Sequence, residues 1–154
     1  MELLPYRRED EADLIRFLTR VDLTLSGLDG VGIRIWIDRG DDGAIRGTTG
    51  YELSDDRRHA LIRSVAVDPS GRREGRGTML ARAALARATA DGARTAWLFS
   101  RRSGPFWQRL GFQPADRDEL AHRLSNTHQV ALFRRTGKLN HEIAWSRPLE
   151  VMRR

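Results

Sequence analysis

The chain has 154 residues, 40% hydrophobic and 31% charged, a composition typical of one globular domain that we expect to span residues 1–154. It contains no cysteine, which excludes disulfides, a thiolate nucleophile and metal sites with Cys ligands. The net charge is +6, but the 27 basic residues are scattered among 21 acidic ones instead of forming one stripe, which favours a solvated surface over nucleic-acid binding.

The sequence also lacks signals for membrane insertion or export. No apolar run is long enough to cross a bilayer, and residues 1–11 lack the apolar stretch of a signal peptide. We therefore expect a cytoplasmic protein without a membrane partner.

The first half of the chain predicts a strand, a helix and an antiparallel meander. Residues 2–6 suit a short strand, and the apolar spacing over residues 10–21 predicts a helix. Ile33, Ile35 and Ile37 alternate with polar or amphipathic residues, as in a half-buried strand, and a turn cluster follows at residues 39–43. Strands at about residues 44–53 and 60–67 complete the meander.

The second half predicts a long helix over residues 75–91 closed by Gly92, a buried strand at 96–99, and a short helix from Pro105 to Gly111. A strand near Phe112, a helix capped by Asp116 and a final strand at residues 141–149 follow. The order β-α-β-β-β-α-β-α-β-α-β predicts an α/β fold, with a mixed, mostly antiparallel sheet flanked by helices. We also expect that the final strand, near Ala144, can pair across a homodimer.

A Gly-rich loop between the strand ending at Val67 and the long helix carries the chemical signal. Backbone N–H groups at the start of a helix, together with its dipole, form an anion site suited to a pyrophosphate. Two other phosphate loops do not fit, because G-x-G-x-x-G would need Gly where Leu80 stands and the Gly-Lys-Ser/Thr of the P-loop is absent.

Two motifs carry a resemblance to a known family. Arg72-x-x-Gly75-x-Gly77 resembles the R/Q-x-x-G-x-G/A signature of the GNAT superfamily of N-acetyltransferases, and the stretch from Phe106 to Phe112 resembles its F-Y-x-x-x-G-F hallmark. The resemblance covers residues 2–115 and is greatest to short acetyltransferases similar to N-acetylglutamate synthase and to arsenic-resistance N-acetyltransferases. It implies the GNAT acyl-CoA N-acyltransferase fold and an acetyl-CoA-dependent enzyme.

The resemblance also implies where the cofactor lies. Acetyl-CoA, a cosubstrate, would lie between the fourth and fifth strands, with pantetheine on the main chain of the fourth strand and pyrophosphate on the loop. The implied cofactor-binding residues are Val65, Ala66, Val67, Arg72, Arg73, Glu74, Gly75, Arg76, Gly77, Thr78 and Phe106. The usual acid–base pair is missing, because Leu61 stands where many members have a Glu base and Trp107 where a Tyr acid is common.

Acetyl transfer requires a neutral amine and stabilisation of the thioester oxygen. A bulge near Ser64 and Val65 would leave a main-chain N–H for that oxygen. For the catalytic base we favour Glu52, for which the alternative is a surface carboxylate paired with Arg63. Tyr6 and Tyr51 are further candidates for an acid.

Two residues are candidates for binding the acceptor. Arg63 would hold a substrate carboxylate, with a solvated strand Arg as the alternative. Trp107 would form a pocket wall, with core or cofactor packing as the alternative. The four histidines have no ligand spacing, so we expect no metal.

The favoured function is an N-acetyltransferase that moves the acetyl group of acetyl-CoA to the amine of a small, amino-acid-like acceptor by direct attack, without a covalent enzyme intermediate. Two alternatives remain at this stage. A non-catalytic acyl-CoA-binding module would account for the missing Glu and Tyr, and an Arg-rich nucleic-acid-binding protein would account for the net charge.

Overall fold

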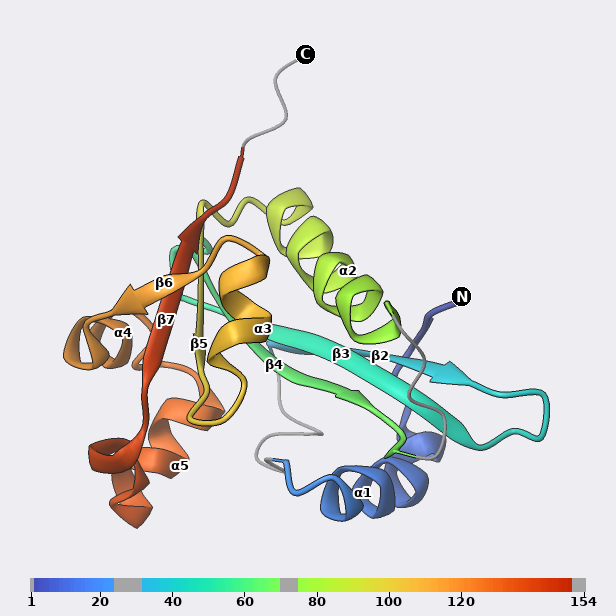
Figure 1. The fold of residues 1–154 in the computed structure, drawn as a ribbon. Helices are drawn as coiled ribbons and strands as arrows, with labels where there is room; N and C mark the ends of the chain where they lie inside the picture. The colour runs from blue at the N-terminus through green and yellow to red at the C-terminus, as the bar shows by residue number, and fades with distance from the viewer. Residues whose placement is uncertain (1, 24–31, 70–74, 151–154) are drawn as a thin grey trace.

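The computed structural model describes residues 2–23, 32–69 and 75–150. Over these residues a single sheet has the strand order β1-β2-β3-β4-β5-β7-β6 (Figure 1). The elements are β1 (Leu4–Pro5), η1 (Arg8–Asp10), α1 (Glu11–Arg20), β2 (Ile33–Arg39), β3 (Ile45–Leu53), β4 (His59–Val67), α2 (Arg76–Ala90), β5 (Thr95–Phe99), α3 (Gly104–Arg109), β6 (Gln113–Ala115), α4 (Arg117–Arg123), α5 (His128–Thr136), η3 (Lys138–His141) and β7 (Ala144–Pro148).

The pairing between β4 and β5 sets the shape of the sheet. It is parallel, whereas the other neighbouring strands run antiparallel. It also involves only the first residues of each strand, from His59 opposite Thr95 to Leu61 opposite Trp97. Beyond this point the two strands diverge (Figure 1), so the sheet opens at their carboxyl ends.

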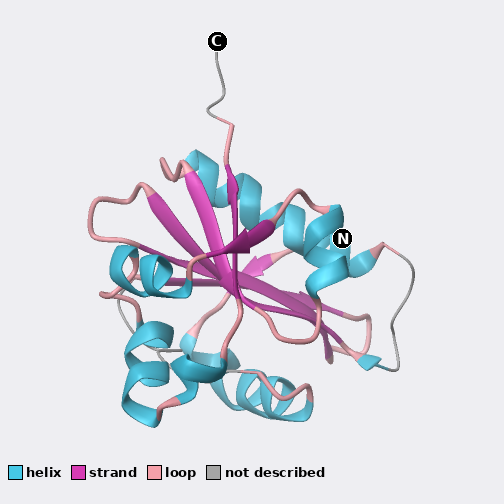
Figure 2. Cartoon of the chain, turned by 60° about the vertical axis from the view of Figure 1, so that its left-hand side comes forward, coloured by secondary structure: helices cyan, strands magenta, loops and turns pink. Residues whose placement is uncertain are grey.

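Helices cover both faces of the sheet (Figure 2). On one face, α2 and α3 bury Tyr51, Ile62 and Leu98. On the other face, α1 packs on the isoleucines of β2, while α4 and α5 cover Leu61 and Trp97. Because side chains alternate along a strand, neighbouring residues of β3 and β4 belong to different layers.

The predicted mixed α/β sheet flanked by helices is confirmed. Gly92 has a φ of 104° and follows the end of α2, as expected for a residue that closes a helix in the left-handed conformation. Asp116 accepts a hydrogen bond from the Glu119 amide (2.9 Å) at the start of α4. The prediction of one helix before the last strand was wrong, because α4 and α5 both lie between β6 and β7.

The final strand is paired within the chain near Ala144, and the expected homodimer stays a prediction. Ala144 lies opposite Phe99 of β5 on one side and Ala115 of β6 on the other. Both edges of β7 are therefore paired within the chain from Ala144 to Ser146, whereas Arg147 and Pro148 pair, among the described strands, with β5 alone.

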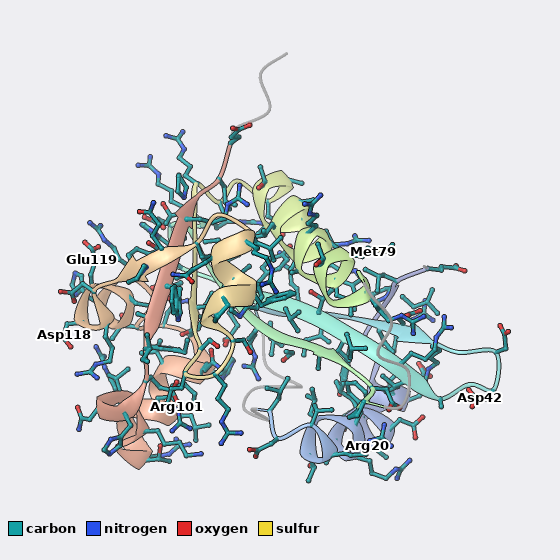
Figure 3. The ribbon with its side chains drawn as sticks, in the orientation of Figure 1. Arg20, Asp42, Met79, Arg101, Asp118 and Glu119 are labelled. Atoms are coloured by element: carbon teal, nitrogen blue, oxygen red, sulfur yellow. The ribbon has the colours of Figure 1, made fainter. Side chains whose placement is uncertain are left out.

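No helix in the described part of the chain is long and apolar enough to cross a membrane. The β2–β3 hairpin projects from one end of the sheet with Asp42 near its tip (Figure 3). The opening between β4 and β5 lies at the carboxyl ends of these strands.

Candidate active site

A bulge interrupts β4 where it leaves β5. Thr48 lies opposite Ala66 and Gly50 opposite Arg63, so Ser64 and Val65 together face the single residue between Thr48 and Gly50. Ser64 has a φ of 59°, which is unusual for a residue other than glycine, and its carbonyl accepts a hydrogen bond from the Thr48 hydroxyl (2.6 Å). The bulge predicted near Ser64 and Val65 is therefore present. It changes the direction of the strand and of its backbone polar groups.

A cavity of about 130 Å³ lies where β4 and β5 separate. Its walls combine residues from both layers of the fold, including Arg63 and Val65 of β4, Trp107 of α3 and Gln129 of α5. Ser100, from the loop after β5, lines it as well. Arg101, labelled in Figure 3, belongs to the same loop. The cavity thus lies in the gap in the sheet.

Arg63 is buried although it lines the cavity. Its side chain is 0% exposed, and its Nη1 lies 3.0 Å from Oε2 of Glu52, which is 3% exposed. Burial lowers the pKa of the Arg63 guanidinium, and the adjacent Glu52 carboxylate opposes that shift. Glu52 and Arg63 therefore form an ion pair between β3 and β4 inside the protein.

The Glu52 carboxylate also accepts hydrogen bonds from the start of α5. Its Oε1 accepts from the backbone amide of His128 (2.7 Å) and its Oε2 from that of Gln129 (3.3 Å). Thr127 accepts from the Val130 amide in the same turn. Negative charge stabilises a helix N-terminus, so Glu52 holds α5 against β3.

The first turn of α2 is suited to an anionic group. Gly75 precedes the helix with a φ of 88°, and a Cβ built on it would meet no atom of the described chain within 4 Å. The turn contains no acidic residue, and no side-chain hydrogen bond caps it in the described part of the chain. Its N–H groups and dipole are then available to a pyrophosphate. Arg76 and Thr78 lie in this turn, whereas Arg72, Arg73 and Glu74 lie outside the described residues.

Phe106 and Trp107 connect this helix to the cavity. A Cβ built on Gly77 would lie 3.6 Å from the Phe106 ring and 3.8 Å from Val67, which places all three side by side. The Phe106 and Trp107 rings are 4.9 Å apart edge to face, and Trp107 lines the cavity. The structure thus brings together most of the predicted cofactor residues that it describes. The Ala66 side chain packs in the layer of α1, whereas its main chain, through which it is predicted to contact pantetheine, lies in β4 between Val65 and Val67.

Neither tyrosine proposed as an acid is among the described residues that line the cavity. The Tyr51 hydroxyl donates to Asp91 at the end of α2, and burial, together with this hydrogen bond, raises the pKa of Tyr51. Tyr6 packs against the cluster beneath α1. In the described part of the chain no group of three or more His, Asp or Glu side chains could hold a metal ion.

The sequence interpretation missed Gln129 and Ser100. Gln129 lies on α5, which was not predicted, although the Ser-Asn-Thr run at residues 125–127 is a signal for a helix start at Thr127. Ser100 lies in the loop after β5, and no local pattern places that loop at the cavity.

Known proteins share this fold. An acetyltransferase of the GNAT family from Staphylococcus aureus has a TM-score of 0.76 at 16% identity, covering 97% of this chain and 99% of its own. N-acetylglutamate synthase from Neisseria gonorrhoeae, complexed with coenzyme A and N-acetyl-glutamate, has a TM-score of 0.72 at 20% identity, covering 97% of this chain and 36% of its own. Rv2747 from Mycobacterium tuberculosis, in a complex that contains CoA, has a TM-score of 0.75 at 17% identity, covering 97% of this chain and 100% of its own.

At these identities the likeness establishes the fold alone. The curated proteins contain no sequence match to this chain. Residues 5–112, however, match the acetyltransferase (GNAT) family. This stretch contains the bulged strand, the start of α2 and the Phe106–Trp107 pair. The chain therefore belongs to the GNAT family of acetyltransferases.

Proposed function

We propose that the protein transfers the acetyl group of acetyl-CoA to the amine of a small, amino-acid-like acceptor by direct attack. The observation that carries this proposal is the cavity at the point where β4 and β5 separate, beside the bulge at Ser64. The cavity is lined from both layers of the fold, so two reactants can approach the gap from opposite faces of the sheet.

The residues on the α2 side fit coenzyme A. The pyrophosphate would lie on the loop and on the first turn of α2, where no described atom lies within 4 Å of a Cβ built on Gly75. The pantetheine would lie along Val65–Val67, beside Phe106. Two of the structural neighbours contain coenzyme A, which supports the same choice.

The bulge is suited to the acyl group. Near Ser64 a main-chain N–H would stabilise the charge that develops on the thioester oxygen during attack. A backbone donor does not replace the Tyr acid in whose place Trp107 stands, so the coenzyme A thiolate would leave as the C–S bond breaks and take its proton from water. Because the chain contains no cysteine, we propose that the amine attacks the thioester directly.

The acceptor would bind on the other side of the gap, where α5 lies. Arg63 lines the cavity there, and a guanidinium binds carboxylates through charge-assisted hydrogen bonds. Trp107 would form a wall of the same site. The neighbour complexed with N-acetyl-glutamate supports an acceptor of the amino-acid class.

The proton of the acceptor ammonium must be removed by a group other than Glu52, the base favoured from the sequence. Both Glu52 oxygens are hydrogen-bonded, to Arg63 and to two amides of α5, and Glu52 is not among the described lining residues. Arg63 has the only ionisable side chain among those lining residues. We propose that the ammonium loses its proton to water, so that kcat/KM rises with pH until the acceptor amine itself is neutral.

The test is an assay of acetyl-CoA-dependent thiol release with a panel of amino acids and their decarboxylated amines. We expect thermal stabilisation by acetyl-CoA and release that is greater with an amino acid than with its matching amine. Stabilisation without release for any amine would contradict the proposed reaction. Equal release from both members of every pair would contradict the acceptor class and leave the reaction supported.

A further inference from the structure

We infer that Glu52 is a positioning residue for acceptor recognition, which fixes both Arg63 and the start of α5 at the acceptor side of the cavity. The inference rests on the proposed function, because it takes Arg63 and α5 to form the acceptor site. It assigns Glu52 a role other than that of general base.

Three elements that are distant in the sequence meet at the Glu52 carboxylate. Glu52 lies on β3, its ion-pair partner Arg63 on β4 at 3.0 Å, and the His128 amide on α5 at 2.7 Å. With their backbone atoms included, Glu52 and Arg63 are 2% and 4% exposed. Their contacts are therefore shielded from water. Charge-assisted hydrogen bonds are stronger in the protein interior than at the surface.

The ion pair restricts a flexible side chain. An unpaired Arg samples many rotamers, but Nη1 of Arg63 is held on Glu52 while the residue still forms part of the cavity wall. The guanidinium can then meet an acceptor carboxylate in one orientation. Without Glu52, the buried guanidinium would lose the carboxylate that neutralises its charge, and Arg63 would reorient.

The same carboxylate sets the position of α5. Gln129 follows His128 at the start of this helix and lines the cavity, and its amide donates to Glu52 Oε2 (3.3 Å). α5 lies outside residues 5–112, the part of the chain that matches the family. Glu52 thus connects the family-matched part of the chain to a wall supplied by residues beyond it, which is where acceptor specificity would be set.

The first experiment is kinetic and compares wild type with Glu52→Gln. The amide keeps the shape of the carboxylate and one acceptor oxygen but loses the charge. We expect the KM of an amino-acid acceptor to rise at least tenfold, with kcat, the shape of the pH profile and the Kd of acetyl-CoA nearly unchanged. The KM of the matching decarboxylated amine should change less than threefold, because Arg63 has no carboxylate to hold there.

The second readout does not depend on activity. Hydrogen exchange at the amides of His128 and Gln129 should become at least tenfold faster in Glu52→Gln, while exchange in α4 stays unchanged. A matched control is Asp38→Asn, which removes another buried carboxylate that is paired with an arginine (Asp38–Arg46, 3.2 Å) on β2. This control should lower stability without altering the acceptor KM or exchange in α5.

Should Glu52→Gln fail to fold, the double variant Glu52→Gln, Arg63→Met removes the buried positive charge as well and should show the same faster exchange in α5. A fall in kcat for every acceptor, with loss of the acidic limb of the pH profile, would overturn the inference and identify Glu52 as the base. Unchanged exchange at the start of α5 would also overturn it. If wild type acetylates no amine, the proposed function fails, whereas the exchange result still decides whether Glu52 positions α5.

Discussion

Alanine substitution of Gly75 tests whether the start of α2 binds the cofactor. Gly75 has a φ of 88°, so an alanine there adopts the left-handed conformation at a cost of about 1–2 kcal/mol. The new methyl group lies beside the first turn of α2 and meets no described atom within 4 Å. The fold should therefore persist, while a pyrophosphate can no longer approach the backbone.

The same helix offers a matched control at its other end. Gly92 has a φ of 104° and, like Gly75, nothing within 4 Å of a built Cβ. Both variants should lower Tm by about 2–8 °C, given roughly 2–4 °C per kcal/mol for a chain of this size. Only Gly75→Ala should weaken acetyl-CoA binding, because Gly92 lies at the carboxyl end of the helix.

The expected loss of acetyl-CoA affinity is that of one hydrogen bond between the backbone and the pyrophosphate. A hydrogen bond to a charged phosphate contributes about 1.5–3 kcal/mol, so the Kd of Gly75→Ala should rise roughly 10- to 150-fold. Isothermal titration calorimetry with acetyl-CoA measures it on the folded variants. Equal affinities for Gly75→Ala and Gly92→Ala would refute the assignment of this turn to the cofactor.

Three further predictions concern stability. Burial raises the pKa of Glu142, so the free energy of unfolding falls as the pH rises and this carboxyl ionises in the folded protein. Glu142→Gln should therefore have a higher Tm than wild type at pH 8 and a similar Tm near pH 4. A difference in Tm that does not change with pH would contradict this. Burial lowers the pKa of His59, whose Nδ1 accepts a hydrogen bond from Trp97 Nε1 (3.0 Å). The free energy of unfolding should therefore decline as the pH falls below about 6.5, the ordinary pKa of a histidine. Urea titrations should find a smaller decline in His59→Gln. Gly50→Ala places a Cβ 2.5 Å from the Arg34 carbonyl oxygen and should cost roughly 1–3 kcal/mol, whereas an unchanged Tm would show that β2 and β3 can separate there.

Local patterns were sufficient for most of the fold. Alternating isoleucines predicted β2, and the run of helix formers before Gly92 predicted α2, because both signals depend on neighbours within a few residues. The start of α5 has a comparable local signal in Thr127, but the sequence interpretation predicted only one helix, capped by Asp116, before the last strand. Because α5 was not predicted, Gln129 was not among the predicted site residues.

The environment of Glu52 could not be predicted in the same way. The sequence interpretation weighed Glu52 as a base against a carboxylate paired with Arg63, and the structure contains that pair, though buried and not at the surface. The bond from the His128 amide joins residues 76 positions apart. No periodicity or motif encodes such a contact, which exists only after β3 and α5 pack together.

A crystal structure of the protein with bound coenzyme A would test the central claim most directly. We expect the pyrophosphate at the first turn of α2, the pantetheine along Val65–Val67, and the thiol in the cavity near Ser64 where β4 and β5 separate. Coenzyme A bound elsewhere, or a thiol outside this cavity, would contradict it.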